Sequence, residues 1–151
     1  MNKAQFIAAM TPLALACAKA SGIPASFTVA QAALESGWGM SKPAVNAMNL
    51  FNVKAGAPWC GRVYQMASTE VEGGKEVLQA AGWRVYSDWK GCVTDRAQFL
   101  ATNPRYAGCF KQTTAEGWAR AVQAAGWATD PQYADKIMAT IRSNNLASLD
   151  A

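Results

Sequence analysis

The chain has 151 residues, a length that suits one domain with a sizeable core. Hydrophobic residues make up 51% and charged residues 16%, which is a globular and not a disordered composition. The chain contains no histidine, which excludes Ser-His and Cys-His nucleophile systems and histidine metal sites, so any chemistry must rest on carboxylates, tyrosines, lysines or thiols.

The formal charge is +4, but the basic residues are scattered and form no run. This distribution indicates an ordinary solvated surface, so we expect no nucleic-acid partner. No segment reaches about 18 apolar residues, so we expect no stable membrane anchor. The four cysteines, Cys17, Cys60, Cys92 and Cys109, lack Cys-x-x-Cys spacing. We therefore expect no metal and no cofactor, and the thiols are either buried and free or paired in one or two disulfides.

The N-terminal segment resembles a secretory signal, because a basic residue precedes an apolar run from Phe6 to Cys17. Pro12 interrupts that run, and its apolar residues recur at three- and four-residue steps, which is typical of an amphipathic helix. We predict a structural helix over residues 3–10 and a second one to about residue 20, with Thr11 as its N-cap and Pro12 at its first position. The chain is then expected to carry no export signal of its own.

The next predicted helix begins at Pro24 and runs through Leu34, and its apolar stripe places Glu35 beside buried residues. A Ser-Gly-Trp-Gly turn at residues 36–39 follows at once. Because a helix end is a rigid mount and glycines let substrate approach closely, Glu35 is a candidate general acid. A glutamate at this place can equally be a solvated last-turn residue. Residues 40–60 lack a clear period and are predicted to form an ordered loop.

Two alternating segments within residues 62–86 flank the sequence Glu72-Gly73-Gly74-Lys75, which predicts a β-hairpin. Three glutamates, Glu70, Glu72 and Glu76, lie near its turn. Residues i and i+2 of a strand share a face, so Glu70 and Glu72 are expected on the same side.

The remainder of the chain is predicted to be helical. A helix that begins near residue 88 ends at Asn103-Pro104. A capping box, Thr113-x-x-Glu116, opens the next helix. The motif Thr129-Asp130-Pro131 provides a cap and a first-position proline for the last helix, and the tail after Asn145 is expected to fray.

The sum is an α+β, mostly helical, lysozyme-like fold with one domain over residues 1–151, in which a helical lobe and a small β-hairpin lobe face each other across a groove. Glycosidic bond cleavage commonly uses two carboxyl groups on opposite sides of the bond. Glu35 and Glu70 form the natural pair, with Glu72 and Glu76 as competitors for the second position. A carboxyl separation of about 5–5.5 Å would favour a retaining enzyme and about 6.5–9.5 Å an inverting one.

Five stretches also resemble one known family in their order and spacing. They are residues 30–39, 49–55, 84–87, 103–107 and 128–134. On these stretches the chain resembles the glycoside hydrolase family 73 N-acetylglucosaminidases over nearly its whole length. The resemblance implies a lysozyme-like fold, peptidoglycan glycan strands as the partner, and hydrolysis of their β-1,4 bonds by an endo-β-N-acetylglucosaminidase.

The resemblance further implies the site residues. Glu35 matches the family's essential acid, Glu70 matches its second carboxylate, and Tyr133 matches a tyrosine that assists in the groove. The expected substrate contacts are Trp38, Asn49, Phe51, Trp59 and Trp127. For Trp38, Trp59 and Tyr133 a packing role stays open beside sugar stacking, and Tyr106 is expected to be a core residue. The chain departs from the family pattern with Trp127 in place of Tyr and Asn52 in place of Gly, and Trp127 can stack on a sugar as tyrosine would.

Several alternatives stay open at this point. The chain can be a muramidase or a lytic transglycosylase of the same fold, or a non-catalytic cell-wall binding module. Glu70 either positions a water or stabilises developing charge, or the sugar's N-acetyl group is the internal nucleophile. We expect a monomer that is made in the cytoplasm and reaches the wall through a holin or a secretion system, as a phage endolysin, a bacterial autolysin or an injected effector.

Overall fold

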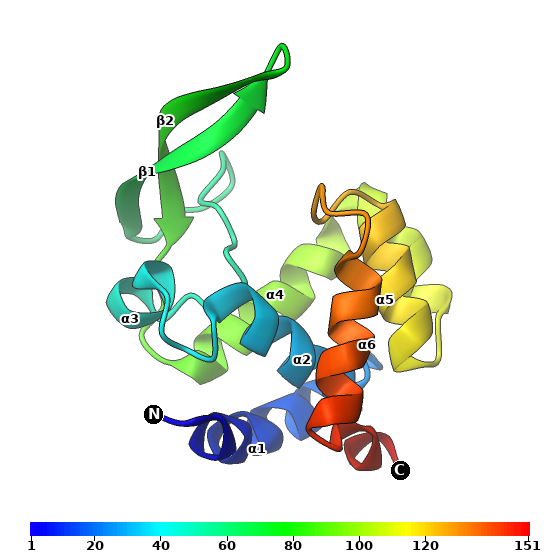
Figure 1. Ribbon diagram of the computed structural model, residues 1–151. Coiled ribbons are helices and arrows are strands. Elements are labelled where there is room, and N and C mark those ends of the chain that lie inside the picture. Colours follow the sequence, from blue (N-terminus) through cyan, green and yellow to red (C-terminus); the bar gives the residue numbers. More distant parts are fainter.

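The computed structural model describes residues 1–151, apart from the side chains of Ser68, Glu70 and Gln79. A helical body carries a two-stranded hairpin that projects away from it (Figure 1). In chain order the elements are α1 (Lys3–Ser21), α2 (Ala25–Ser36), α3 (Lys42–Ala47), β1 (Val63–Glu72), β2 (Lys75–Arg84), α4 (Trp89–Thr102), the 3₁₀-helix η1 (Pro104–Lys111), α5 (Ala115–Ala124), α6 (Tyr133–Ser143) and the 3₁₀-helix η2 (Leu146–Asp150). This arrangement confirms the predicted α+β, mostly helical plan with a small hairpin lobe.

Helix α1 is continuous, so the prediction of two helices meeting at Thr11 was wrong. Four residues of one stripe are buried: Phe6, Met10, Ala14 and Cys17. Packing of this stripe against α2 and α4 holds the helix together across Pro12. Pro12 cannot bond the carbonyl of Ala8, but both residues are exposed, so water can serve that carbonyl. The Thr11 hydroxyl, offered as an N-cap, instead donates to the carbonyl of Ile7 at 2.7 Å.

Helix α2 lies at the centre of the helical body (Figure 1), and ten of its twelve residues are buried. Its small side chains let α1, α5, α6 and η2 pack around it. Pro24, the N-cap residue of α2, has no side-chain group that could cap the helix. Asp150 of η2 caps it instead by accepting hydrogen bonds from the Ser26 N–H at 2.9 Å and from the Ser26 hydroxyl. The tail after Asn145 therefore does not fray as predicted, since Leu146 is buried and Asp150 is bound.

The predicted loop at residues 40–60 contains a short helix, α3, that the sequence pattern did not predict. Six residues are too few for a helical period to be recognised. Ser41 caps α3 by accepting from the Ala44 N–H at 3.3 Å, and a proline lies in its first turn. After α3 the side chain of Asn49 closes a tight turn, accepting from the Val53 N–H at 3.1 Å and donating to the Val53 carbonyl at 2.9 Å.

The hairpin has the predicted strands and turn. β1 and β2 pair antiparallel from Val63 opposite Arg84 to Glu72 opposite Lys75. The two glycines between them have positive φ, which a two-residue turn of this kind requires. At the hairpin base, Trp83 is buried and forms a bridge with Lys54 of the loop below. The hairpin is thus attached to the helical body at one end only.

The next helix, α4, was predicted with the correct ends. Asp88 caps it by accepting from the Gly91 N–H at 2.7 Å, and Asn103 ends it before the proline. The 3₁₀-helix η1 that follows was not predicted, and it buries Tyr106 against the body. Because η1 continues directly from α4, it places that tyrosine next to the end of α4.

The last two helices begin slightly later than predicted. Thr114, and not Thr113, caps α5 by accepting from a backbone N–H at 3.0 Å. Asp130 accepts from the Gln132 N–H at 2.9 Å, which closes a turn, so α6 begins only at Tyr133. Both predicted starts were thus early, α5 by one residue and α6 by the turn that Asp130 closes before Gln132.

The four cysteines are free thiols, with Cys60 exposed and the other three buried. Of the two alternatives left open by the sequence, the structure therefore has free thiols. Burial raises the pKa of the Cys92 thiol to about 12 and also raises the pKa of Cys109. None of the helices described here has the length and hydrophobicity that crossing a bilayer requires.

Candidate active site

Glu35 lies in the last turn of α2, where the chain leaves the helix abruptly. Gly37 ends the helix with a φ of 55°, and the Ser36 hydroxyl donates to the carbonyl one turn earlier at 2.6 Å while accepting the Gly39 N–H at 2.8 Å. A Cβ on Gly39, whose φ is 82°, would lie 3.3 Å from the Phe6 ring. The Ser-Gly-Trp-Gly stretch is thus a tight turn that its glycines permit, and it leaves Glu35 half-buried.

Three neutral donors hold the Glu35 carboxyl group. The indole N–H of Trp127 donates to Oε1 at 2.8 Å, and the hydroxyl of Tyr133 donates to the same oxygen at 2.9 Å. The side-chain amide of Asn52 donates to Oε2 at 2.9 Å. Oε1 therefore accepts two of these hydrogen bonds and Oε2 one, so a proton on this carboxyl group is most easily carried by Oε2.

Tyr133 lies beneath Glu35 and is only 4% exposed. Its hydroxyl donates to Glu35 and accepts from the Gln31 amide at 3.2 Å. Burial raises the pKa of Tyr133 well above its ordinary value, and the nearby charge of Glu35 adds to the rise. The phenol therefore stays protonated and remains a hydrogen-bond donor to Glu35 over the whole physiological range.

A buried cation lies in the core below this network. Arg96 has no exposed surface, and its guanidinium lies 4.6 Å from the centroid of the Phe51 ring and donates to the hydroxyl of Thr28. Burial lowers the pKa of Arg96, and its charge opposes the rise in the pKa of Tyr133. The Arg96 charge thus acts electrostatically on Tyr133, the residue whose hydroxyl donates to Glu35.

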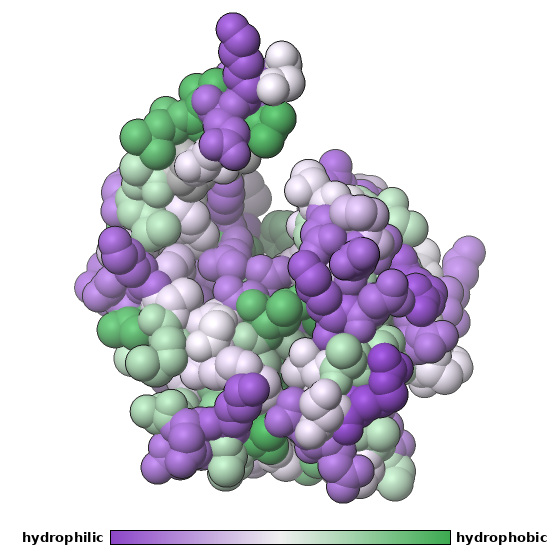
Figure 2. Space-filling view, viewed as in Figure 1, coloured by the Kyte–Doolittle hydropathy of each residue, from purple (hydrophilic) through white to green (hydrophobic). Residues whose placement is uncertain are grey.

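Glu35 opens onto a groove of about 360 Å³. Nine residues line it: Glu35, Phe51, Asn52, Val53, Lys54, Phe99, Tyr106, Trp127 and Ala128. They come from the end of α2, the loop after α3, α4, η1 and the loop between α5 and α6. Figure 2 shows the surface hollowed between the hairpin and the part of the body formed by α5 and α6. Glu35 therefore lies on the wall of a groove whose lining residues belong to the helices and loops of the body and not to β1 or β2.

An aromatic cluster forms one wall of the groove. The ring of Trp127 lies 5.8 Å from Tyr106 and 6.1 Å from Phe99, measured between centroids. Trp127 was predicted as a substrate contact and Tyr106 as a core residue. In the structure Trp127 lines the groove and also donates a hydrogen bond to Glu35. Tyr106 is buried, with 4% of its surface exposed, and it also lines the groove.

A second hollow of about 380 Å³ adjoins the groove, and Phe99 lines both. Trp59 lies here, with its ring 4.9 Å from the guanidinium of Arg84. Arg84 in turn donates to Asp95 at 2.9 Å, and Asp95 also accepts from the Tyr86 hydroxyl. The aromatic ring of Trp59 is therefore fixed next to the groove, consistent with its prediction as a substrate contact.

Two other predicted contacts lie away from the groove. Trp38 packs edge-on against Phe6, and the Lys3 ammonium lies 5.0 Å from its ring. Asn49 has no exposed surface, and its amide is used by the backbone carbonyls of Val53 and Arg84. We therefore assign both residues structural roles. Phe51, also predicted as a contact, is 1% exposed and forms the floor of the groove.

Glu70, the predicted second carboxylate, lies in strand β1 of the hairpin. The side chain of Glu70 lies outside the described part of the structure, whereas its backbone pairs with Val77 in the hairpin. Its competitors Glu72 and Glu76 are both exposed, opposite Lys75 and Val71 respectively. Cross-strand partners share a face and neighbours alternate, so Glu72 and Glu76 lie on opposite faces of the hairpin.

Sequence reasoning did not predict three members of the site. Asn52 and Gln31 bond the Glu35–Tyr133 pair, and Phe99 separates the two hollows. The only signal for Asn52 was its departure from the family pattern. Its φ of 55° explains why glycine suits this position, since few other residues adopt a left-handed backbone.

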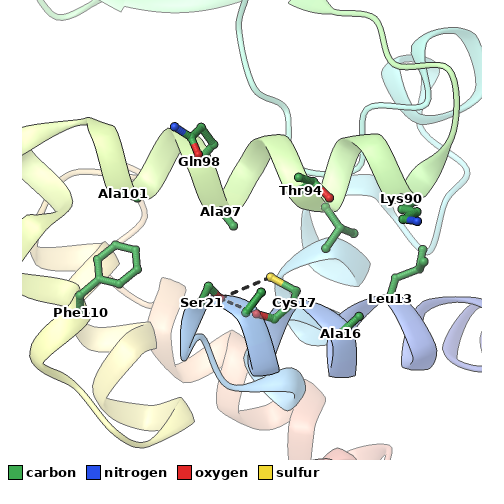
Figure 3. Close-up of a pocket in the computed structure, with 12 residues that line it drawn as sticks. Leu13, Ala16, Cys17, Ser21, Lys90, Thr94, Ala97, Gln98, Ala101 and Phe110 are labelled. Carbon is green, nitrogen blue, oxygen red and sulfur yellow. Dashed lines mark hydrogen bonds between the residues drawn. The ribbon is translucent and has the colours of Figure 1, made fainter.

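A larger cavity of about 480 Å³ lies elsewhere, between α1 and α4 (Figure 3). Leu13, Ala16 and Cys17 face it from α1, and Ala97 and Ala101 face it from α4. Its lining is mostly apolar, and none of its twelve lining residues is a carboxylate. It lacks the acid that glycosidic chemistry needs, so we place the candidate active site at Glu35.

Comparison with known proteins agrees with this geometry. The family model for glucosaminidases, described as mannosyl-glycoprotein endo-beta-N-acetylglucosaminidase, matches residues 11–146. The chain belongs to this family. Membership confirms the resemblance drawn from the five sequence stretches and makes the chain a glycoside hydrolase by class.

Two curated relatives and one solved structure illustrate the similarity. The peptidoglycan hydrolase FlgJ of Pseudomonas aeruginosa is 41% identical over 138 residues, which is 88% of this chain and 34% of that protein. The exo-glucosaminidase LytG of Bacillus subtilis is 38% identical over 135 residues, 83% of this chain and 45% of that protein. A peptidoglycan hydrolase mutant from Sphingomonas sp. A1 superposes with a TM-score of 0.83 at 39% identity, over 98% of this glucosaminidase-family chain and 97% of that one. The chain thus spans less than half the length of these two curated relatives.

Proposed function

We propose that the chain hydrolyses β-1,4 glycosidic bonds in the glycan strands of bacterial peptidoglycan as an endo-β-N-acetylglucosaminidase. The observation that carries the proposal is the Glu35 carboxyl group, fixed by three donors on the wall of a groove with aromatic lining. The name of FlgJ as a peptidoglycan hydrolase supports the substrate, and the description of the family model as an endo-beta-N-acetylglucosaminidase supports the bond and the endo mode of cleavage. LytG is named an exo-glucosaminidase, which supports the bond alone.

In this mechanism Glu35 is the general acid. The proton on Oε2 passes to the leaving glycosidic oxygen as an oxocarbenium-like transition state forms. Because Oε1 accepts hydrogen bonds from Trp127 and Tyr133, it stays turned away from that transfer. In this mechanism Tyr133 acts on the substrate only through Glu35, since it is not among the residues that line the groove.

Glu70, in strand β1 of the hairpin, is the proposed second carboxylate. It either positions the attacking water or stabilises the developing positive charge, while the sugar's own N-acetyl group is the other candidate nucleophile. Replacing Glu70 by Gln should cost less activity than replacing Glu35 if the hairpin carboxylate only stabilises charge.

The sugar rings are proposed to stack on the aromatic wall. Trp127 and Tyr106 line the groove beside Glu35, and Trp59 extends this surface into the adjoining hollow. Flat aromatic faces bind the apolar faces of sugar rings through their large contact area. The enzyme would act at the cell wall as a monomer, with residues 1–151 forming one catalytic domain.

The test is digestion of purified sacculi by the wild-type protein and by Glu35→Gln, followed by mass spectrometry of the new ends. Reducing N-acetylglucosamine ends support the proposal. Reducing N-acetylmuramic acid would indicate a muramidase, anhydro ends a lytic transglycosylase, and binding without release a binding module. Long fragments at early times support endo cleavage, whereas single disaccharides would contradict it.

The Glu35→Gln variant should lower the rate by about 10²- to 10⁴-fold, the scale of lost general acid catalysis. In this variant the amide N–H group of Gln at position 35 would face the N–H group of Asn52, so that two donors meet where a donor met an acceptor. Asn52 cannot turn away easily, because its amide also donates to the main-chain carbonyl of residue 35. Circular dichroism and thermal unfolding of the variant are therefore part of the test. A folded Glu35→Gln protein that still lyses sacculi at the wild-type rate would overturn the assignment.

A further inference from the structure

We propose that Asn52 is a positioning residue for Glu35, and that its side-chain amide holds Glu35 Oε2 in the orientation from which the proton is transferred. This inference rests on the proposed function, because it assigns a role within the same site. It concerns a residue at which the chain differs from the family pattern, so family membership does not supply it.

The side-chain amide of Asn52 donates two hydrogen bonds to the same residue, Glu35. Nδ2 donates to Glu35 Oε2 at 2.9 Å and to the Glu35 main-chain carbonyl at 2.9 Å. The carbonyl is one of those that the end of α2 leaves without a helical partner, so the second bond also caps the helix. Because one amide group bonds both the main-chain carbonyl and the carboxyl group of Glu35, it restricts the side-chain torsions of Glu35 between these two points.

The backbone around Asn52 is itself rigid. Asn52 has a φ of 55°, in the left-handed region where asparagine is among the few tolerated non-glycine residues. Phe51 and Val53 on either side are 1% and 3% exposed, and Asn49 closes the turn through two bonds to Val53. The loop is therefore held from both sides, and the amide is presented to Glu35 without freedom to move.

The arrangement also distinguishes the two carboxyl oxygens. Trp127 and Tyr133 both donate to Oε1, which leaves that oxygen fully used. Asn52 donates to Oε2, which keeps one lone pair for the proton. Without Asn52, Glu35 would keep its Oε1 contacts but could rotate about them, and the acid would point along a range of directions.

Asn52→Gly is the sharpest test, because glycine adopts the same φ without strain while the amide is removed. Asn52→Asp keeps the shape and the backbone preference but replaces the donor by an acceptor. The matched control is Asn145→Gly, which makes the same change at a φ of 52° in an exposed position at the start of η2. All variants are assayed on soluble glycan fragments of defined length, with wild type and Glu35→Gln in parallel.

We expect Asn52→Gly to lower kcat by about 10- to 100-fold, the equivalent of one hydrogen bond to a charged group, with KM within about twofold of wild type. Asn52→Asp should be slower still at neutral pH, and Asn145→Gly should match wild type. Thermal unfolding supplies a second readout: Asn52→Gly should be less destabilising in the Glu35→Gln background, where it removes the conflict between two amides.

The outcomes separate this inference from the proposed function. If wild type releases no reducing ends, or Glu35→Gln remains fully active, the proposed function fails. If wild type is active and Glu35→Gln is not, but Asn52→Gly keeps its kcat, only the role of Asn52 is wrong. A raised KM with unchanged kcat would make Asn52 a substrate contact, and a loss of rate that merely follows the unfolded fraction would make it a structural residue.

Discussion

Replacing Tyr133 by Phe removes one oxygen atom from the centre of the network and leaves the ring in place. The hydroxyl donates to Glu35 Oε1 at 2.9 Å and accepts from the Gln31 amide at 3.2 Å, and Gln31 has no exposed surface. A hydrogen bond to a charged group contributes about 1.5–3 kcal/mol, and an unsatisfied buried donor costs about 1–3 kcal/mol. We therefore expect a loss of about 2.5–6 kcal/mol in the free energy of unfolding, or a Tm lower by about 5–24 °C.

The same change should slow catalysis without weakening binding. With the phenol gone, Oε1 and Oε2 each keep one donor, from Trp127 and Asn52, so the proton is no longer confined to Oε2. We expect kcat to fall by about 10- to 100-fold while KM stays near wild type, because Tyr133 is not among the residues that line the groove.

Steady-state kinetics on soluble glycan fragments and urea unfolding measure the two effects separately. Tyr86→Phe is the matched control, because Tyr86 is also buried and its hydroxyl bonds Asp95 and not Glu35. That variant should lose similar stability and keep its kcat. A Tyr133→Phe protein with an unchanged kcat, or with a raised KM alone, would refute the idea that Tyr133 acts through Glu35.

Three further predictions concern the fold. Pro12→Ala should raise the free energy of unfolding by about 1–3 kcal/mol in urea titrations, since it restores a backbone hydrogen bond inside an exposed part of α1; no gain would show that water replaces this hydrogen bond in the wild-type protein without cost. Asp150→Ala should lower Tm by several degrees, about 1–2 kcal/mol, through loss of both bonds from Ser26, and an unchanged Tm would mean that η2 does not cap α2. The folded pKa of Cys92 is raised from 9.0 to about 12, so this contribution to stability is intact below about pH 9 and is lost as pH rises toward 12. Cys92→Ala should therefore lose less stability than wild type between about pH 8 and pH 10, and parallel losses would contradict the assignment.

Local signals in the sequence were sufficient to predict the hairpin and most of the helices. Glycine pairs, a strand alternation and Asp88 as a cap predicted the hairpin and α4, because those features depend on residues close together in the chain. The errors arose where distant packing decides. Pro12 does not break α1 because its apolar stripe is held by α2 and α4, and the C-terminal tail is ordered because Asp150 reaches the start of α2, 124 residues away.

The candidate site shows the same division. The motif around Glu35 identified the candidate acid, since a helix end with glycines after it is a local feature. The partners of that acid lie 17, 92 and 98 residues from it, and the sequence spacing contains no measure of their hydrogen bonds. Trp38 and Asn49 were expected in the groove because they belong to the same motifs, yet motif membership does not separate a residue that supports a turn from one that faces a substrate.

The chemistry of the three donors explains how a chain without histidine can be built for acid catalysis. A general acid loses and regains its proton in each turnover, so its surroundings must orient it in both states. A lysine or arginine bound directly to a carboxylate would strongly favour the ionised form. An indole, an amide and a phenol carry no charge, and burial keeps the Tyr133 phenol protonated by raising its pKa. The guanidinium of Arg96 is buried in the core, where it donates a hydrogen bond to the hydroxyl of Thr28. Glu35 is thus oriented by neutral groups, an arrangement that fixes its direction while leaving its proton transferable.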